Sequence, residues 1–529
     1  MIKKLTQTLL ALALVGGMTA CDKSMKGVDE GTTSATGDTY MSVAFSTANP
    51  NSTRAEDKNF NSIGEYIGRD EIKNVNVYVI NLPEETVELN EVNIVTKNPD
   101  NDANTKDFRT EAWKTTAGDK IIYVYVNIKG TKIADALNAA TSKTAFEKAA
   151  KDAYSLTENG VVLEGIAKYN KTDDKDIIAM APIEPKTLNV KAGVTKDDAE
   201  AKNKPFAQAK NCVQVSVRRL VAQAAVTASA DKFEIKEGAD VLVTFDKLQW
   251  DVMQFEQTTF LAPQPVKADA EPAQNPMLTQ FCKSPSFDFI TTDANYTTDA
   301  GAKYAYRAFT GEPVATFTRS TNTDAVEKNK EDVANIVKNP MKFITETTHQ
   351  FGDKLEADGG TAPFTGYRKG NTTYVIIAAQ ITPQGNALAE GQTYTAGNDL
   401  FYGVQDKKFY ADKATAQANN APSVAFTDGR DNVIKYAKGI CYYVAWLNPD
   451  NATDPVKSPI LRNNIYHVNI KAIKKLGYSG NPFDPTNKTP KDPDDKTPDP
   501  KETLYPIDTY MSVEISVVNW GVHSYDHEF

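Results

Sequence analysis

Apolar residues recur at every second position in many short stretches of this chain. This alternation is typical of β-strands that bury one face, because successive side chains point to opposite sides of a strand. The stretches that show it are 75–79, 122–128, 213–217, 241–245 and 465–470, and further strand patterns occur at 374–379, 409–410 and 441–447. Residues 132–155 change instead to a helical period, with apolar residues three or four positions apart in two sets, Ile133, Leu137 and Ala140, then Phe146, Ala149 and Ala153, and we expect one or two helices there. The pattern predicts a mainly β protein with a few helices, not a βαβ fold.

The order of these stretches predicts two β-sandwich domains, at 55–255 and 256–477. A proline-rich connection follows the predicted boundary, and the stretch 291–360 is polar, so we expect it to be loop-rich. At 529 residues the chain is long enough for two such cores.

Residues 38–43 and 508–513 have the same six letters, Asp-Thr-Tyr-Met-Ser-Val. Around the first copy, the alternation predicts one half-buried strand over 39–46. Its apolar face carries Met41, Val43 and Phe45, and its other face carries Tyr40, Ser42 and Ala44. Two distant segments with one sequence can fill the same kind of place in a sheet.

The second copy lies in a C-terminal arm, 508–529, behind a proline-rich linker at 478–507. The linker favours extended polyproline II, and about 27 residues at about 3.1 Å each would reach about 85 Å. One face of the arm carries Met511, Val513, Ile515 and Val517, and we expect this face, and not Tyr510, Ser512 and Glu514, to enter a groove. The apolar phase then shifts to Val518, Trp520 and Val522, so we expect two short strands.

The N-terminus has the pattern of an export signal at 1–20, with Lys3 and Lys4 before a short apolar run. Cys21 directly follows Ala20, as in the lipobox of bacterial lipoproteins, and a flexible polar tether at 22–37 comes next. We therefore expect Cys21 to carry lipid. The alternative is an ordinary secretory signal with a chance cysteine.

These segments suggest a strand exchange. In the precursor the strand at 39–46 would cover a groove, within a propeptide at 21–54. Arg54, the first arginine of the chain, lies in a polar loop, where a protease cuts most readily, so we expect cleavage between Arg54 and Ala55. The arm of another copy would then enter the groove. The alternative is that both copies of the six letters are permanent neighbours in one sheet.

Composition and motifs narrow the function further. The net charge of −10 argues against a nucleic-acid partner, and the sequence holds no HExxH, GxSxG or P-loop motif. We expect no catalytic residues, no metal and no cofactor. Of the histidines, His467 is expected to face out from its strand, and Trp250, Trp446 and Trp520 are interpreted as core residues rather than sugar platforms. Cys212, Cys282 and Cys441 show no metal or redox spacing.

Several longer stretches resemble the fimbrillin family of the Bacteroidales, and within it the shaft subunits of short (minor) fimbriae. They are 367–375 (Tyr-Arg-Lys-Gly-Asn-Thr-Thr-Tyr-Val), 443–449 (Tyr-Val-Ala-Trp-Leu-Asn-Pro), 462–477 and the arm at 508–525. The resemblance implies two transthyretin-like, Greek-key β-sandwich domains and a lipoprotein precursor. It also implies that Cys21 is lipidated, that an Arg-specific protease cuts at Arg54-Ala55, and that the donor arm joins one copy to the next.

The leading hypothesis is therefore a cell-surface fimbrial shaft subunit that mediates adhesion, whose precursor is held at the outer membrane by lipid. Its expected partners are other copies of itself, accessory tip and anchor proteins, the protease, and host or bacterial receptors. The alternatives are a surface lipoprotein that binds glycan or protein without polymerising, and a fimbrial tip or anchor component.

Overall fold

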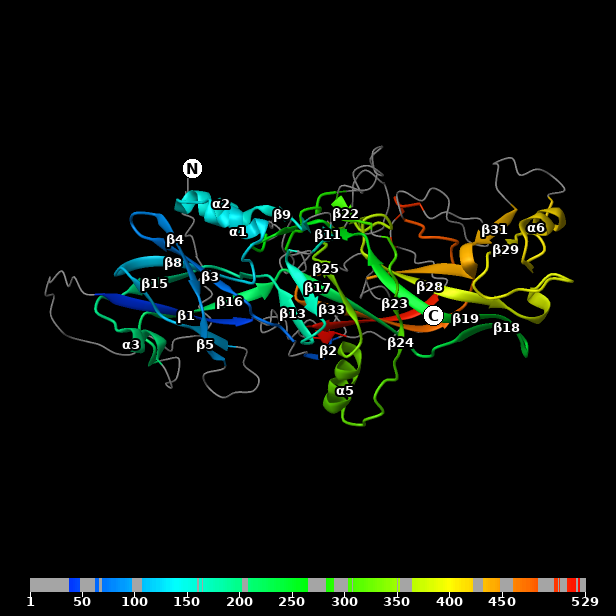
Figure 1. The fold of residues 1–529 in the computed structure, drawn as a ribbon, viewed down its shortest axis with the longest axis horizontal. Helices are drawn as coiled ribbons and strands as arrows, with labels where there is room; N and C mark the ends of the chain where they lie inside the picture. The colour runs from blue at the N-terminus through cyan, green and yellow to red at the C-terminus, as the bar shows by residue number, and fades with distance from the viewer. Residues whose placement is uncertain are drawn as a thin grey trace, which may run out of the picture.

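The computed structural model is an elongated, mainly β molecule (Figure 1). It describes residues 38–47, 62–65, 69–97, 107–158, 161–163, 165–201, 208–264, 282–289, 303–306, 308–349, 351–352, 364–421, 432–447, 460–483, 499–502, 504, 511–519 and 522–523. Within these ranges no helix is both long and apolar enough to cross a membrane.

A ten-stranded sheet occupies the end of the molecule that carries the N-terminal half, with the strand order β4-β3-β8-β14-β16-β1-β6-β5. β15 also pairs with β8, and β7 pairs with β1. The strands are β1 (Thr39–Thr47), β3 (Val75–Asn81), β4 (Thr86–Val92), β5 (Ile94–Lys97), β6 (Asp107–Thr110), β7 (Trp113–Thr115), β8 (Gly118–Val126), β14 (Met180–Pro182), β15 (Lys186–Val190) and β16 (Cys212–Arg219). β1 is therefore an internal strand of this sheet.

The helical period at 132–155 is confirmed as α1 (Lys132–Asn138) and α2 (Lys143–Lys151). Each begins at a hydroxyl cap, because the side chains of Thr131 and Ser142 accept hydrogen bonds from the first turn. The Phe146 ring packs 4.9 Å from the rings of Tyr78 and Tyr123, so the helices cover one face of the sheet. Short pairs at this end are β10 (Thr157–Glu158) with β11 (Val161–Val162), β12 (Ala167–Asn170) with β13 (Lys175–Ile178), and β9 (Ala153–Ser155) with β21 (Thr258–Phe260).

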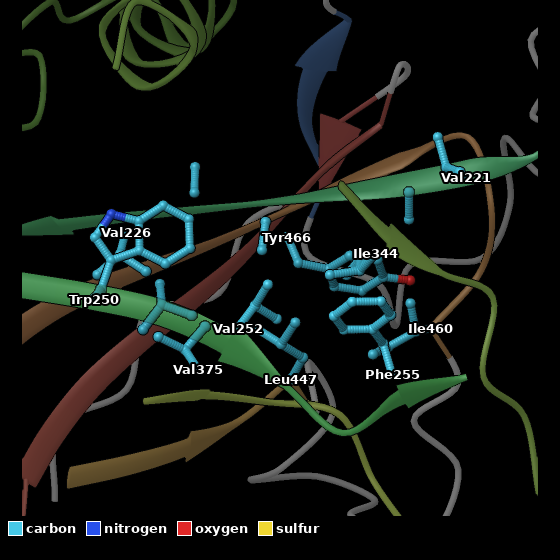
Figure 2. Packing of buried hydrophobic residues seen from close by; sticks show 14 of the residues in the cluster. Val221, Val226, Trp250, Val252, Phe255, Ile344, Val375, Leu447, Ile460 and Tyr466 are labelled. Atoms are coloured by element: carbon cyan, nitrogen blue, oxygen red, sulfur yellow. The ribbon is translucent and has the colours of Figure 1, made fainter. Parts of the chain in front are cut away.

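Two larger sheets make the rest of the molecule. The seven-stranded sheet contains β2 (Ser62–Glu65), β17 (Val221–Ala228), β24 (Ala315–Thr316), β25 (Met341–Thr345), β33 (Asn464–Ile473), β34 (Met511–Asn519) and β35 (Val522–His523). The five-stranded sheet contains β18 (Phe233–Glu237), β19 (Asp240–Met253), β23 (Glu312–Pro313), β28 (Tyr374–Pro383) and β32 (Ile440–Trp446). The two sheets share one core. Figure 2 shows Trp250, Val252 and Leu447 packed there together with Val221 and Val226 of β17. The mainly β prediction is confirmed; the Greek-key connectivity stays a prediction.

The remaining elements are short strand pairings and helices, of which α5 is the longest. They are β20 (Phe255–Glu256) with β22 (Tyr304–Ala305), β26 (Phe351–Gly352) with β27 (Phe364–Thr365), β29 (Leu400–Gly403) with β30 (Phe409–Tyr410) and β31 (Val433–Tyr436), and the helices α3 (Lys196–Glu200), α5 (Ala325–Val337), α6 (Lys413–Asn419), η5 (Gly385–Ala387) and η6 (Ala437–Gly439). The chain changes sheet at Leu220, between β16 and β17, which is earlier than the domain boundary expected at 255. The domain division itself stays a prediction.

The stretch 291–360, which is expected to be loop-rich, also contains α5, which buries Val333, Ile336 and Val337. Part of the predicted linker at 478–507 packs against the body of the protein. Phe483 is buried between Tyr374 and Trp446, and its ring centroid lies 5.6 and 5.5 Å from theirs. The part of the linker that is free to extend is therefore shorter than expected.

Candidate functional site: the groove of the first strand

We call the space that β1 fills, between β16 and β6, the β1 groove. β1 runs parallel to β16 from Ser42 opposite Cys212 to Thr47 opposite Val217. On its other edge it runs antiparallel to β6, and its beginning pairs with β7. Since both edges of β1 are paired, its removal would leave unpaired backbone donors and acceptors on both sides of the groove.

The predicted apolar face of β1 is confirmed. Met41, Val43 and Phe45 are each 0% exposed and lie in one core cluster with residues of β3, β8 and β16. The Phe45 ring stacks on Phe108 of β6 with 5.1 Å between the ring centroids. At about 1.5–3 kcal/mol for each fully buried apolar side chain, this face gives about 5–9 kcal/mol as an upper estimate.

The expectation that β1 is only half-buried is wrong. Ser42 and Ala44, on the second face, are 0% and 3% exposed. The short helix α3 covers this face, and Ser42 Oγ donates a hydrogen bond of 2.7 Å to the carbonyl of Ala199. The covering helix was not predicted, because its sequence, Lys-Asp-Asp-Ala-Glu, has no apolar period.

The first residues of β1 make contacts that depend on their side chains. Asp38 forms an ion pair of 2.5 Å with Lys114, and the carboxylate raises the pKa of that lysine. Thr39 Oγ1 donates to the carbonyl of Lys191 at 2.7 Å and accepts from the backbone N–H of Val194 at 3.2 Å. These contacts fix where along the groove the strand begins.

Asn211 completes this end of the groove. Its Nδ2 atom donates to Thr39 Oγ1 at 3.3 Å and to the carbonyl of Tyr40 at 3.1 Å. Asn211 is 8% exposed, so few other partners can reach it. Asp38, Thr39 and Ser42, which supply the side-chain contacts to the groove, all lie within the six copied letters.

A buried arginine lies beside the middle of β1. Arg109 of β6 is directly opposite Ala44 and is 1% exposed. Its Nη1 atom donates to the carbonyls of Glu200 and Ala201, at 3.0 Å each, at the end of α3. Sequence reasoning missed this residue, because Asp-Phe-Arg-Thr in β6 shows too short an alternation to mark a strand.

The C-terminal arm lies elsewhere. β34 pairs antiparallel with β33, from Asn519 opposite Asn464 to Met511 opposite Ile473, and parallel with β2. The prediction of two short strands is confirmed by β34 and β35. Because β1 and β34 belong to different sheets, the interpretation that the two copies are permanent neighbours in one sheet is wrong.

Other predicted residues fall outside the described ranges. They are Cys21, Arg54, Ala55 and Trp520, together with the side chains of the arm. Arg54 and Ala55 come between the end of β1 and the start of β2 in the sequence, so a cut there would separate these two strands. Their roles stay predictions.

The buried titratable groups belong to the core. The expectation that His467 faces out is wrong, because it is 1% exposed and its Nε2 atom lies 2.7 Å from Thr227 Oγ1. Burial lowers the pKa of His467 to about 3 and that of His349 to about 4. Burial raises the pKa of Glu256 to about 8. In the described ranges no group of three or more His, Cys, Asp or Glu residues is placed to hold a metal.

Trp250 is 0% exposed, as expected for a core residue, and Trp446 is partly buried against Phe483. Cys212, Cys282 and Cys441 form no disulfide within the described part of the chain.

Two comparisons with known proteins agree. The family model of fimbrillin, the major fimbrial subunit protein type IV, C-terminal, matches residues 434–526. The minor fimbrium subunit Mfa1 of Porphyromonas gingivalis is 31% identical over 559 aligned residues, which cover 99% of this chain and 100% of that relative. This chain belongs to the fimbrillin family. The predicted resemblance is confirmed, and this fimbrillin is a structural subunit of cell-surface fimbriae, not an enzyme.

Solved structures of other fimbrial proteins are also similar to this fimbrillin. A fimbrilin (FimA) from Porphyromonas gingivalis covers 93% of this chain and 99% of its own, with a TM-score of 0.37 and 12% identity. The tip fimbrial protein Mfa3 from the same organism covers 83% of this chain and 97% of its own, with a TM-score of 0.30 and 12% identity.

Proposed function

We propose that this fimbrillin is a shaft subunit that polymerises by strand exchange and mediates adhesion. Cleavage after Arg54 releases β1 from the groove, and the arm of a second copy, beginning at Asp508, takes its place. The observation that carries the proposal is that the side-chain contacts of Asp38, Thr39 and Ser42 with the groove fall within the copied letters. Asp508, Thr509 and Ser512 can repeat them.

The register of β1 extends this argument to the apolar face. Placing the copied letters in the same positions puts Met511, Val513 and Ile515 where Met41, Val43 and Phe45 are now. Val517 then takes the position of Thr47.

Cleavage after Arg54 explains why the arm replaces β1 only in the processed chain. Before cleavage β1 is joined to the sheet through the chain, so its effective concentration at the groove is on the order of millimolar and a second copy competes poorly. After cleavage β1 belongs to a separate peptide, 21–54, and is no longer joined to the groove through the chain. The incoming arm is part of a whole subunit, and a head-to-tail contact that does not close into a ring grows a filament.

The remaining parts of the proposal concern the cell surface. Lipid on Cys21 would hold the precursor at the outer membrane, and the cut by an Arg-specific protease would separate the subunit from this anchor. Accessory tip and anchor proteins and surface receptors would be the other partners. In the polymer the arm leaves β33, where it lies in the single chain.

An assembly assay tests this proposal. The full precursor, an Arg54→Ala variant and a chain ending before Asp508 are each treated with an Arg-specific protease and analysed on an unheated denaturing gel. We expect a ladder of polymers from the precursor alone. A precursor that is cut after Arg54 and stays monomeric would contradict the proposal, and so would a ladder from either variant.

A further inference from the structure

β1 and the arm first differ at the position that directly follows the six identical letters. There Ala44 in β1 corresponds to Glu514 in the arm. Ala44 lies directly opposite Arg109 in the ladder between β1 and β6. Resting on the proposed function, we infer that Glu514 of the donated arm forms a buried ion pair with Arg109 of the next subunit. The released strand, with Ala44, cannot form it.

The geometry places both side chains on the same face. Phe45 and Phe108, the next pair along the ladder, stack on the core side with 5.1 Å between their ring centroids. Side chains alternate along both strands, so Ala44 and Arg109 point to the opposite side, toward α3. The Cβ atoms of directly opposed residues in an antiparallel ladder are about 4.5–5.5 Å apart, which a glutamate carboxylate and a guanidinium readily span.

The charges on this face favour a further carboxylate. Arg109 and Glu200 are each 1% exposed, and Lys196 Nζ lies 3.7 Å from Glu200 Oε1. Glu200 Oε1 also accepts from the backbone N–H of Ala112 at 3.0 Å. Among the described residues of this face, Arg109 and Lys196 are cations and Glu200 is a carboxylate, so Glu514 would bring a further carboxylate beside Arg109. At the rim, Asp198 and Lys210 already pair with each other at 3.1 Å.

The larger side chain needs room. Ala44 is 3% exposed beneath α3, so Glu514 requires α3 to shift outward. α3 has only five residues and is joined to this face by the hydrogen bonds of Ser42, Arg109 and Ala112 given above and by the packing of Ala199 against Ala112. The exchange therefore replaces a methyl group under α3 by a charge-assisted pair, which is stronger than a neutral hydrogen bond.

Glu514→Ala gives the arm the residue of the leaving strand and provides the direct test. Cleaved full-length chains with Glu514, Glu514→Ala and Glu514→Gln are polymerised, and the rate at which their ladders lose subunits on warming is measured. Ile515→Val, on the other face, is the matched control. Because truncating one partner of a buried charge pair costs at least about 2 kcal/mol, we expect dissociation roughly 30-fold faster for Glu514→Ala and an intermediate rate for Glu514→Gln. The control should change the rate much less.

The reciprocal changes are made in the acceptor. In Arg109→Gln acceptors, the difference between arms with Glu514 and Glu514→Ala should disappear. If Arg109→Gln does not fold, Ala44→Glu in the precursor replaces it, and β1 should then stay bound after the cut and delay polymerisation. Equal dissociation rates for the Glu514 and Glu514→Ala arms would overturn the ion pair and leave strand exchange intact. Failure of the unmodified chain to polymerise would instead refute the proposed function, and this inference with it.

Discussion

At the scale of single residues, polar contacts decide where a strand can lie in the β1 groove. Apolar side chains alone specify the face but tolerate sliding by two positions, because alternate residues are similar. Thr39, which is buried and hydrogen-bonded to the backbone of Lys191 and Val194, specifies the register, whereas the exposed ion pair of Asp38 with Lys114 contributes less. An arm with the same letters would therefore have the same starting point in the groove.

The buried histidines make stability depend on pH. Burial, and then the charge of Arg319, lower the pKa of His467 to about 3, whereas an unfolded histidine titrates near its ordinary value of about 6.5. The contribution of neutral His467 is fully present above about pH 6.5 and is lost as the pH falls toward the folded pKa.

In His467→Gln the free energy of unfolding should therefore decrease less between pH 6.5 and 4.5 than in the unsubstituted protein. Urea denaturation at several pH values measures this. His349→Gln is the matched comparison, because the pKa of His349 is lowered to about 4 for the same reason. An unchanged slope in His467→Gln would contradict this assignment, even if that variant is less stable at neutral pH.

At the scale of elements, alternation in the sequence predicted the strands that bury one face, and the helical period at 132–155 located α1 and α2. It failed where both faces are covered. β33 is paired on both edges, because it lies between β17 and β34. Its face with His467 was expected to meet solvent, but the ring of Phe317 packs there, with 5.2 Å between the two ring centroids. It also failed for α5, in which three buried apolar residues are spread among charged ones, although Asp324 caps its first turn.

A matched pair of substitutions separates the two strands. Val43 is 0% exposed in β1, so Val43→Asp should prevent the precursor from folding its N-terminal sheet. Val513→Asp should leave folding and cleavage after Arg54 intact but abolish the ladder, because the charge would enter the same position in the next subunit. Ser516→Asp, at the position of the half-buried Ser46, is the control that should still polymerise. Ladders from Val513→Asp would contradict the assignment of the inserted face.

At the scale of the whole molecule, β1 and β34 lie in different sheets of one elongated chain (Figure 1). The sequence alone predicted the strand, its apolar face and the arm, since each depends on local alternation. It did not predict Arg109, Asn211 or α3, because these meet β1 only through long-range packing. It also overestimated the free linker, since Lys369 pairs with Glu502 at 2.5 Å and holds part of it to the body.

The most direct measurement uses a cysteine that the groove already has. In the ladder with β16, Ser42 lies opposite Cys212, and Ser46 lies opposite Ser216. Chains with Ser512→Cys, and control chains with Ser516→Cys, are cleaved after Arg54, oxidised and analysed by denaturing electrophoresis without reductant. Strand exchange predicts that Ser512→Cys chains form covalent multimers joined through Cys212. It predicts none from Ser516→Cys chains, and none from Ser512→Cys chains that also carry Arg54→Ala and stay uncut. Cleaved Ser512→Cys chains that form polymers without this disulfide would contradict the placement of the arm in the β1 groove.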